Sequence, residues 1–132
     1  MNWKLIFQLS MFGLAMGIGT VFFIPSSVEP VLWLAIFILC AVIIAKRQVR
    51  APFLHGLLVG LVNSVWVTGA HLLFFDTYLA SHAREATMMK DSPIPSRLVM
   101  ACTGPIVGFL SGVILGLFAL AANKLLRRAS QP

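Results

Sequence analysis

Charged side chains are scarce in this chain of 132 residues, and acidic ones are the scarcest of all. Only 11% of the residues are charged and only four are Asp or Glu, whereas a soluble domain carries about 25% charged residues. Hydrophobic residues make up 59% of the chain, and the mean hydropathy is +0.94. This balance excludes an ordinary water-soluble domain and indicates a membrane protein.

Cysteine and catalytic motifs are also scarce. The two cysteines, Cys40 and Cys102, both lie inside apolar runs, where a thiol is expected to pack as a small apolar side chain. The chain has no HExxH, GxSxG, Walker or dinucleotide-binding motif. We therefore predict no catalytic residues, no metal and no cofactor, and we do not expect an enzyme.

Four apolar runs fill most of the chain, and each is long enough to cross a bilayer as a helix, which takes ~20 residues. We expect spans at about residues 5–24, 28–46, 52–75 and 97–126. The first run is longer than the apolar part of a signal peptide, so we expect it to be retained. The predicted fold is all-α, an integral membrane four-helix bundle that forms a single domain over residues 1–132.

The only long connection, residues 76–97, is too polar to cross a bilayer. Apolar residues recur at a roughly helical period over residues 77–89, which predicts a short interfacial helix between the third and fourth spans. Pro105 lies inside the last run. It should either bend that helix or mark a later start.

Basic residues are distributed unequally between the two ends of the predicted bundle. The end with both termini holds seven of the ten, namely Lys4, Lys46, Arg47, Arg50, Lys124, Arg127 and Arg128. The other end holds all four acidic residues, Glu29, Asp76, Glu85 and Asp91. This bias predicts that both termini are cytoplasmic and contact anionic lipid head groups. Basic residues at span ends do not form a nucleic-acid surface.

Glycine recurs at every fourth position of the last span, which places these residues on one face of a helix. A face without side chains lets another helix approach closely. The favoured partner is the third span, which has its own GxxxG pair, and the alternative is the last span of a second copy. The predicted helix-packing residues are Gly13, Gly17, Gly56, Gly60, Gly104, Gly108, Gly112 and Gly116.

Polar side chains form a stripe on the third span, with an acidic residue just beyond it. The members are Asn63, Ser64, Thr68, His71 and Asp76. Such residues either bond across to neighbouring helices or line a pathway. No charged residue lies in the middle of a span, so we favour a structural role, in which Asn63 and Thr68 form cross-helix hydrogen bonds.

Two groups of residues near this stripe carry side chains that could bind a metal or support catalysis. His71, Asp76 and His82 carry metal-ligand atoms, but their spacings of five and six do not share a helix face, so we expect no metal site. Asp76, Glu85, Arg84 and His82 could support acid–base chemistry. A loop of this length commonly contains such residues, and we do not favour an active site.

Short motifs in the second half resemble an uncharacterised family of small bacterial four-span membrane proteins. The motifs are Phe53-Leu54-His55-Gly56-Leu57-Leu58-Val59-Gly60, Asn63, Asp76-Thr77-Tyr78-Leu79, Met88-Met89 and Thr103-Gly104-Pro105. The resemblance covers residues 53–126. It implies a bacterial inner-membrane location and supplies no activity.

Two functions therefore fit the sequence. The favoured one is a structural or accessory membrane protein, packed through glycine-rich helices and able to join a homo-oligomer or a membrane partner. The alternative is a small oligomeric channel or transporter lined by the polar stripe.

Overall fold

The computed structural model describes residues 1–130, and its regular structure is entirely α-helical. The six helices are α1 (Trp3–Phe22), α2 (Glu29–Lys46), α3 (Pro52–Leu73), α4 (Phe75–Ser81), α5 (Ala83–Lys90) and α6 (Ser96–Ala129). Four of them, α1, α2, α3 and α6, are long and apolar enough to span a membrane. The all-α fold and the four apolar helices predicted from the sequence are confirmed, with boundaries that differ by up to three residues.

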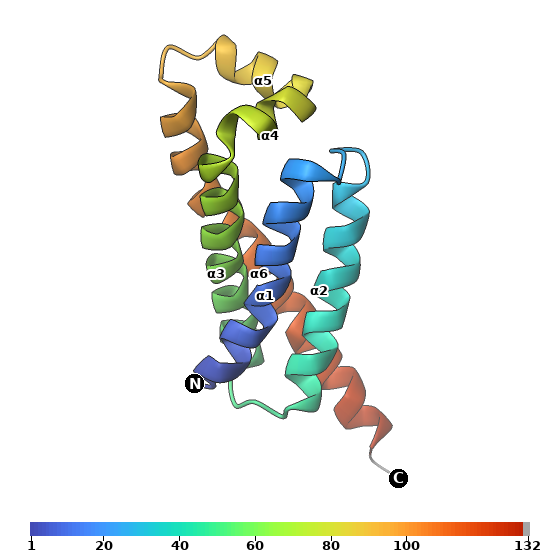
Figure 1. The fold of residues 1–132 in the computed structure, drawn as a ribbon. Coiled ribbons are helices and arrows are strands. Elements are labelled where there is room, and N and C mark those ends of the chain that lie inside the picture. The colour runs from blue at the N-terminus through green and yellow to red at the C-terminus, as the bar shows by residue number, and fades with distance from the viewer. Residues whose placement is uncertain (131–132) are drawn as a thin grey trace.

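The four long helices form a bundle with two unlike ends (Figure 1). One end carries both termini and the α2–α3 turn, and the other carries α4, α5 and the α1–α2 turn. We call them the terminal end and the α4–α5 end. Helix α6 runs obliquely behind the others, from beside α3 at the α4–α5 end to below α2 at the terminal end (Figure 1). The tilt of α6 determines which helices are in contact at each position along the bundle axis.

Helix α3 lies at the centre because its glycines allow α6 to approach backbone to backbone. Gly60 packs directly on Gly112, and a Cβ added to Gly56 would lie only 2.6 Å from the Gly116 Cα. Further along, Gly108 faces Ser64 and Gly104 faces Thr68, while Gly116 also faces Phe53. On the other side of α3, Gly13 of α1 packs on Asn63 and Gly17 packs on Val67 and Ala70. The eight predicted packing glycines therefore lie at the α3–α6 and α1–α3 contacts of one chain.

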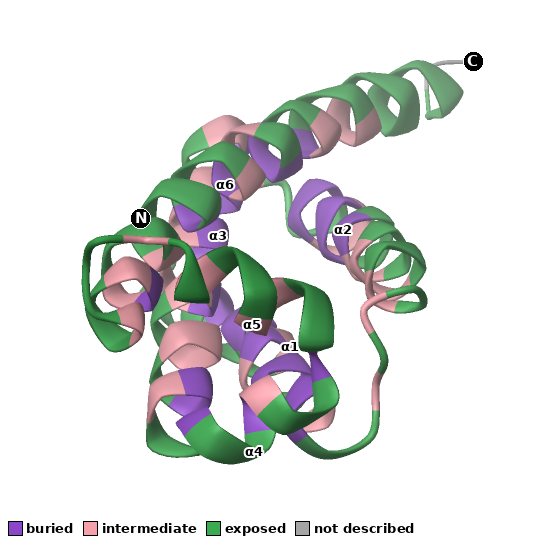
Figure 2. Cartoon of the chain, turned by 90° about the horizontal axis from the view of Figure 1, so that it is seen from above, coloured by how far each residue is buried: buried purple, intermediate pink, exposed green. Residues whose placement is uncertain are grey.

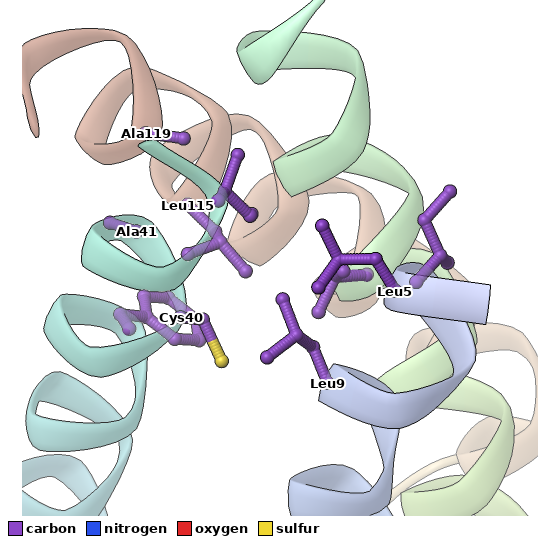
Figure 3. Close-up of a cluster of buried hydrophobic side chains, with 10 residues drawn as sticks. Leu5, Leu9, Cys40, Ala41, Leu115 and Ala119 are labelled. Carbon is purple, nitrogen blue, oxygen red and sulfur yellow. The ribbon is translucent and has the colours of Figure 1, made fainter. Parts of the chain in front are cut away.

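Helix α2 is packed differently, by apolar side chains near the terminal end. Its buried residues all lie between Phe37 and Ala45, and none lies in its first eight residues. They join a core with residues from α1, α3 and α6, and Figure 3 shows Leu9, Cys40 and Leu115 of this core approaching one another. Seen from the α4–α5 end, α2 stands beside α6 and apart from α5 (Figure 2).

The connection between α3 and α6 differs from the single interfacial helix predicted at residues 77–89. It contains two helices, α4 and α5, separated at His82, whose backbone is not helical (φ −126°, ψ 69°). The His82 ring explains the break, because its Nδ1 donates to the Tyr78 carbonyl at 3.0 Å. That carbonyl would accept the His82 backbone N–H in a continuous helix. The bend directs α5 over the end of the bundle.

Pro105 lies within α6, which begins at Ser96 and continues past it. The alternative of a later helical start is therefore wrong. Proline removes one backbone donor, and the residue itself is exposed, so its ring does not obstruct the glycine face.

Candidate functional site

A groove of about 750 Å³ lies between α2 on one side and the α3–α6 pair on the other. Tyr78 of α4 and three residues of α5, namely Glu85, Met88 and Met89, line its upper part at the α4–α5 end. The groove exists because α2 and α6 converge only towards the terminal end, as the tilt of α6 requires (Figures 1 and 2). A second hollow of about 580 Å³ lies at the terminal end, between the start of α1 and residues 47–55.

The groove is closed below and open at its side. Phe37 and Phe118 line its lower part, and both belong to the apolar core that fills the terminal half of the bundle. Leu34, Val107 and Ile114 line it between α2 and α6, yet they are 51%, 59% and 46% exposed. A molecule can therefore reach the groove from the side of the bundle.

Asn63 supplies the most unusual polar group of the groove. Its side chain is 4% exposed, and neither its amide nitrogen nor its amide oxygen has a hydrogen-bond partner in the described chain. The expected cross-helix hydrogen bond of Asn63 is therefore wrong: its neighbour across the α1–α3 contact is Gly13, which has no polar side chain to offer. Leaving a buried amide unpaired costs roughly 1–3 kcal/mol.

Ser64 and Thr68 belong to the same groove but are less available. The Ser64 hydroxyl donates to the Leu61 carbonyl at 2.8 Å, a local bond within the helix. Thr68 packs against Gly104. The cross-helix hydrogen bonds that the sequence led us to expect are made by other residues, with Trp66 Nε1 donating to Ser10 Oγ at 3.2 Å.

His71 and Tyr78 close the upper back wall of the groove. The His71 Nε2 lies 2.7 Å from the Thr20 hydroxyl, which itself donates to the Met16 carbonyl at 2.8 Å. If the Thr20 proton goes to the Met16 carbonyl, the Thr20 oxygen accepts from His71 Nε2–H. The Tyr78 ring stacks between His71 and His82, with ring centroids 4.0 and 4.2 Å away. This column ties α1, α3 and α4 together.

Two carboxylates lie at the α4–α5 end of the groove. Glu29 Oε1 accepts from Trp33 Nε1, and Glu85 Oε1 accepts from the Ser26 hydroxyl, each at 3.2 Å. Glu85 Oε2 is buried without a partner. Burial, and then the negative charges of Glu85 and Glu29, raise the pKa of Tyr78 to about 12, so its phenol stays neutral at physiological pH. No Lys or Arg from residues 1–130 lines the groove.

Asp76 does not join the polar stripe, although the sequence placed it there. It is exposed on α4 and does not line the groove. Within the described residues no group of three His, Cys, Asp or Glu side chains could hold a metal ion. His71 and His82 are separated by the Tyr78 ring, and Arg84 is exposed. The structure therefore brings together neither the candidate metal ligands nor the candidate acid–base residues considered from the sequence.

Tyr78 and Glu29 also line the groove, although neither was predicted from the sequence to be a site residue. A usable signal was present, since His71, Tyr78 and His82 are separated by seven and four residues, a spacing that shares one face of a helix. Glu29 had no such signal, because its place at the groove depends on the tilt of α6.

Comparison with known proteins gives no further guide: no protein-family model, no curated protein and no solved structure shows a significant match to this chain.

Proposed function

We propose that this chain is a non-catalytic, multi-pass membrane protein that binds an amphipathic molecule in the groove between α2 and the α3–α6 pair. In this proposal the glycine-packed helices form a fixed frame, which is the structural or accessory role favoured by the sequence. We further propose a bacterial inner-membrane location with both termini cytoplasmic, from the basic residues and the resemblance described above. Membership in that four-span family stays a prediction.

The observation that carries the proposal is a largely apolar groove whose lining includes residues with unpaired buried polar atoms, namely Glu85 Oε2 at the α4–α5 end and the Asn63 amide deeper in the bundle. Apolar pockets with a few well-placed polar groups are typical ligand sites. Buried polar atoms are rarely left without a partner, and a bound molecule with a polar head could supply one to Glu85 Oε2. The lateral opening at Leu34 and Val107 would face the lipid, which favours a ligand that partitions into the bilayer.

The alternative, a channel or transporter lined by the polar stripe, is less well supported by the packing of one chain. A pathway has to continue across the bilayer, but the stripe ends at Asn63. Beyond it the terminal half is filled by side chains with almost no exposure, such as Ile6, Ile44 and Leu115. Binding requires only the half of the bundle that is open.

Fluorine NMR of the fluorotryptophan-labelled protein in lipid nanodiscs tests the proposal. Trp33 lines the groove, whereas Trp3 and Trp66 do not and report general changes in the bilayer. The probes are dodecyltrimethylammonium, dodecyldimethylamine N-oxide and dodecanoate, which differ in head-group charge. We expect at least one of them to shift the Trp33 signal saturably.

Matched variants on α6 locate the binding. Ser111→Phe and Val107→Phe both place a ring at the groove lining and should abolish the saturable shift. Leu110→Phe adds the same ring at a position that is 56% exposed and outside the groove, and should leave the shift unchanged. Three tryptophan signals that move together without saturation, for every probe and in every variant, would exclude the proposed function.

A further inference from the structure

The polar groups of the groove are divided by charge along its length. Both of its carboxylates, Glu29 and Glu85, lie at the α4–α5 end, and the rest of the lining is apolar or uncharged apart from His71. The His71 Nε2 is already hydrogen-bonded to the Thr20 hydroxyl. A ligand with its head at this end meets two negative charges and no Lys or Arg from the described chain.

The carboxylates are held in place but are not neutralised. Trp33 and Ser26 each donate one hydrogen bond, to Glu29 Oε1 and Glu85 Oε1 respectively. These bonds fix the side chains and leave further acceptor positions, because an ionised carboxylate has about four. Glu85 Oε2 is buried and unpaired. A buried anionic oxygen without a partner is costly unless a cation or a donor reaches it.

The aromatic residues at this end favour a cation for a second reason. Trp33 lines the groove beside Glu29, and the face of an indole attracts an ammonium group. Tyr78 cannot offer its faces, since both are covered by histidine rings. It contributes a neutral hydroxyl instead, because burial and the two carboxylates raise its pKa.

We infer that the ligand is an amphipathic cation, with an ammonium or amine head between Glu29, Glu85 and Trp33. Its apolar tail extends between α2 and α6 towards Phe118. A phosphate-bearing or carboxylate head is disfavoured, because it would meet the same two carboxylates without a basic partner. This inference rests on the proposed function and names the ligand class of the same groove.

The test compares affinities for dodecyltrimethylammonium and dodecyldimethylamine N-oxide, whose heads are similar in size but differ in net charge in slightly alkaline buffer. The Trp33 fluorine signal is titrated with each probe in nanodiscs of uncharged lipid. We expect the cation to bind at least about tenfold more tightly, a factor that corresponds to about 1.4 kcal/mol. Removing both charges with Glu29→Gln and Glu85→Gln should reduce this preference to within roughly twofold.

Asp76→Gln is the matched control, since it removes one negative charge from the same end of the bundle at an exposed position outside the groove. It should retain the full preference for the cation. Equal affinities for the two probes in the unmodified protein would overturn the cationic head while leaving groove binding intact. An unchanged preference for the cation in the double variant Glu29→Gln, Glu85→Gln would also overturn the cationic head. Absence of binding by every probe would instead overturn the proposed function.

Discussion

At the scale of single residues, Asn63 is a polar side chain that is buried in the bundle without a hydrogen-bond partner. Gly13 leaves room for Asn63 at the α1–α3 contact but gives it no polar partner. A leucine has the same branched shape and the same number of side-chain heavy atoms without an unpaired donor and acceptor. The asparagine therefore makes the empty bundle less stable than a leucine at the same position would.

Replacing Asn63 by leucine is thus expected to raise the free energy of unfolding of the empty protein by about 1 kcal/mol, because the unpaired amide is removed. Thermal unfolding in detergent measures the change. Ser64→Ala is the control and should have little effect, since the lost hydrogen bond lies within the helix. A clear loss of stability in Asn63→Leu would mean that the amide has a partner in the folded chain, and the argument from the unpaired amide would fail.

At the scale of helices, the contacts of α3 depend on the positions of glycine residues, which have no side chain. Glycine spacing predicted a contact face on α6, and in the structure Gly60 and Gly56 of α3 meet Gly112 and Gly116. Spacing alone could not determine the angle at which the helices cross. That angle depends on larger neighbours such as Phe53 and Thr68, which face Gly116 and Gly104, and it determines how far α2 stands from α3.

The break between α4 and α5 illustrates a different limit of the sequence. Residues 77–89 have a helical period, yet the His82 side chain takes the place of its own backbone N–H at the Tyr78 carbonyl. A histidine at that position does not by itself predict a helix break. The reason for the break becomes clear from the structure, in which the His82 ring stacks on Tyr78. Tertiary packing of one side chain therefore overrides the local pattern.

Two glycines of α3 provide a matched test of the packing. A methyl group at Gly60 would meet the Gly112 backbone, whereas one at Gly69 would meet nothing within 4 Å. Gly60→Ala should lower the free energy of unfolding by about 1–3 kcal/mol, because α6 is forced outward. Gly69→Ala should be neutral or stabilise the helix by up to ~1 kcal/mol. Equal melting temperatures for the two variants in detergent would rule out the close α3–α6 contact.

At the scale of the whole molecule, the two ends of the bundle differ in both charge and packing. The charge difference could be predicted because each basic residue has a fixed place between apolar runs. The packing difference could not, because it depends on residues distant in sequence, such as Phe37 and Leu115, which meet in one core. The groove is the space left where that core ends, and no local pattern in the sequence marks it.

The proposed orientation can be tested by cysteine labelling in intact cells, in a Cys40→Ala, Cys102→Ala background. Ala83→Cys lies at the exposed start of α5, and Ser130→Cys lies just after α6. An impermeant thiol reagent should label the first and not the second, because the excess of basic residues at the terminal end favours the cytoplasmic side for that end. Lysed cells, in which both should react, provide the control. Labelling of Ser130→Cys alone would reverse the orientation.

The uneven packing of α2 bears on how fast the groove could exchange its occupant. All buried residues of this helix lie from Phe37 onwards, so its first eight residues and residues 23–28 can move without separating any glycine contact between α3 and α6. Local openings of this kind require only a small part of the global free energy of unfolding, and such loop and helix motions fall in the nanosecond-to-millisecond range. A ligand would then enter and leave many times within the life of one folded molecule. The protein would act as a rapidly exchanging reservoir in the bilayer rather than as a trap.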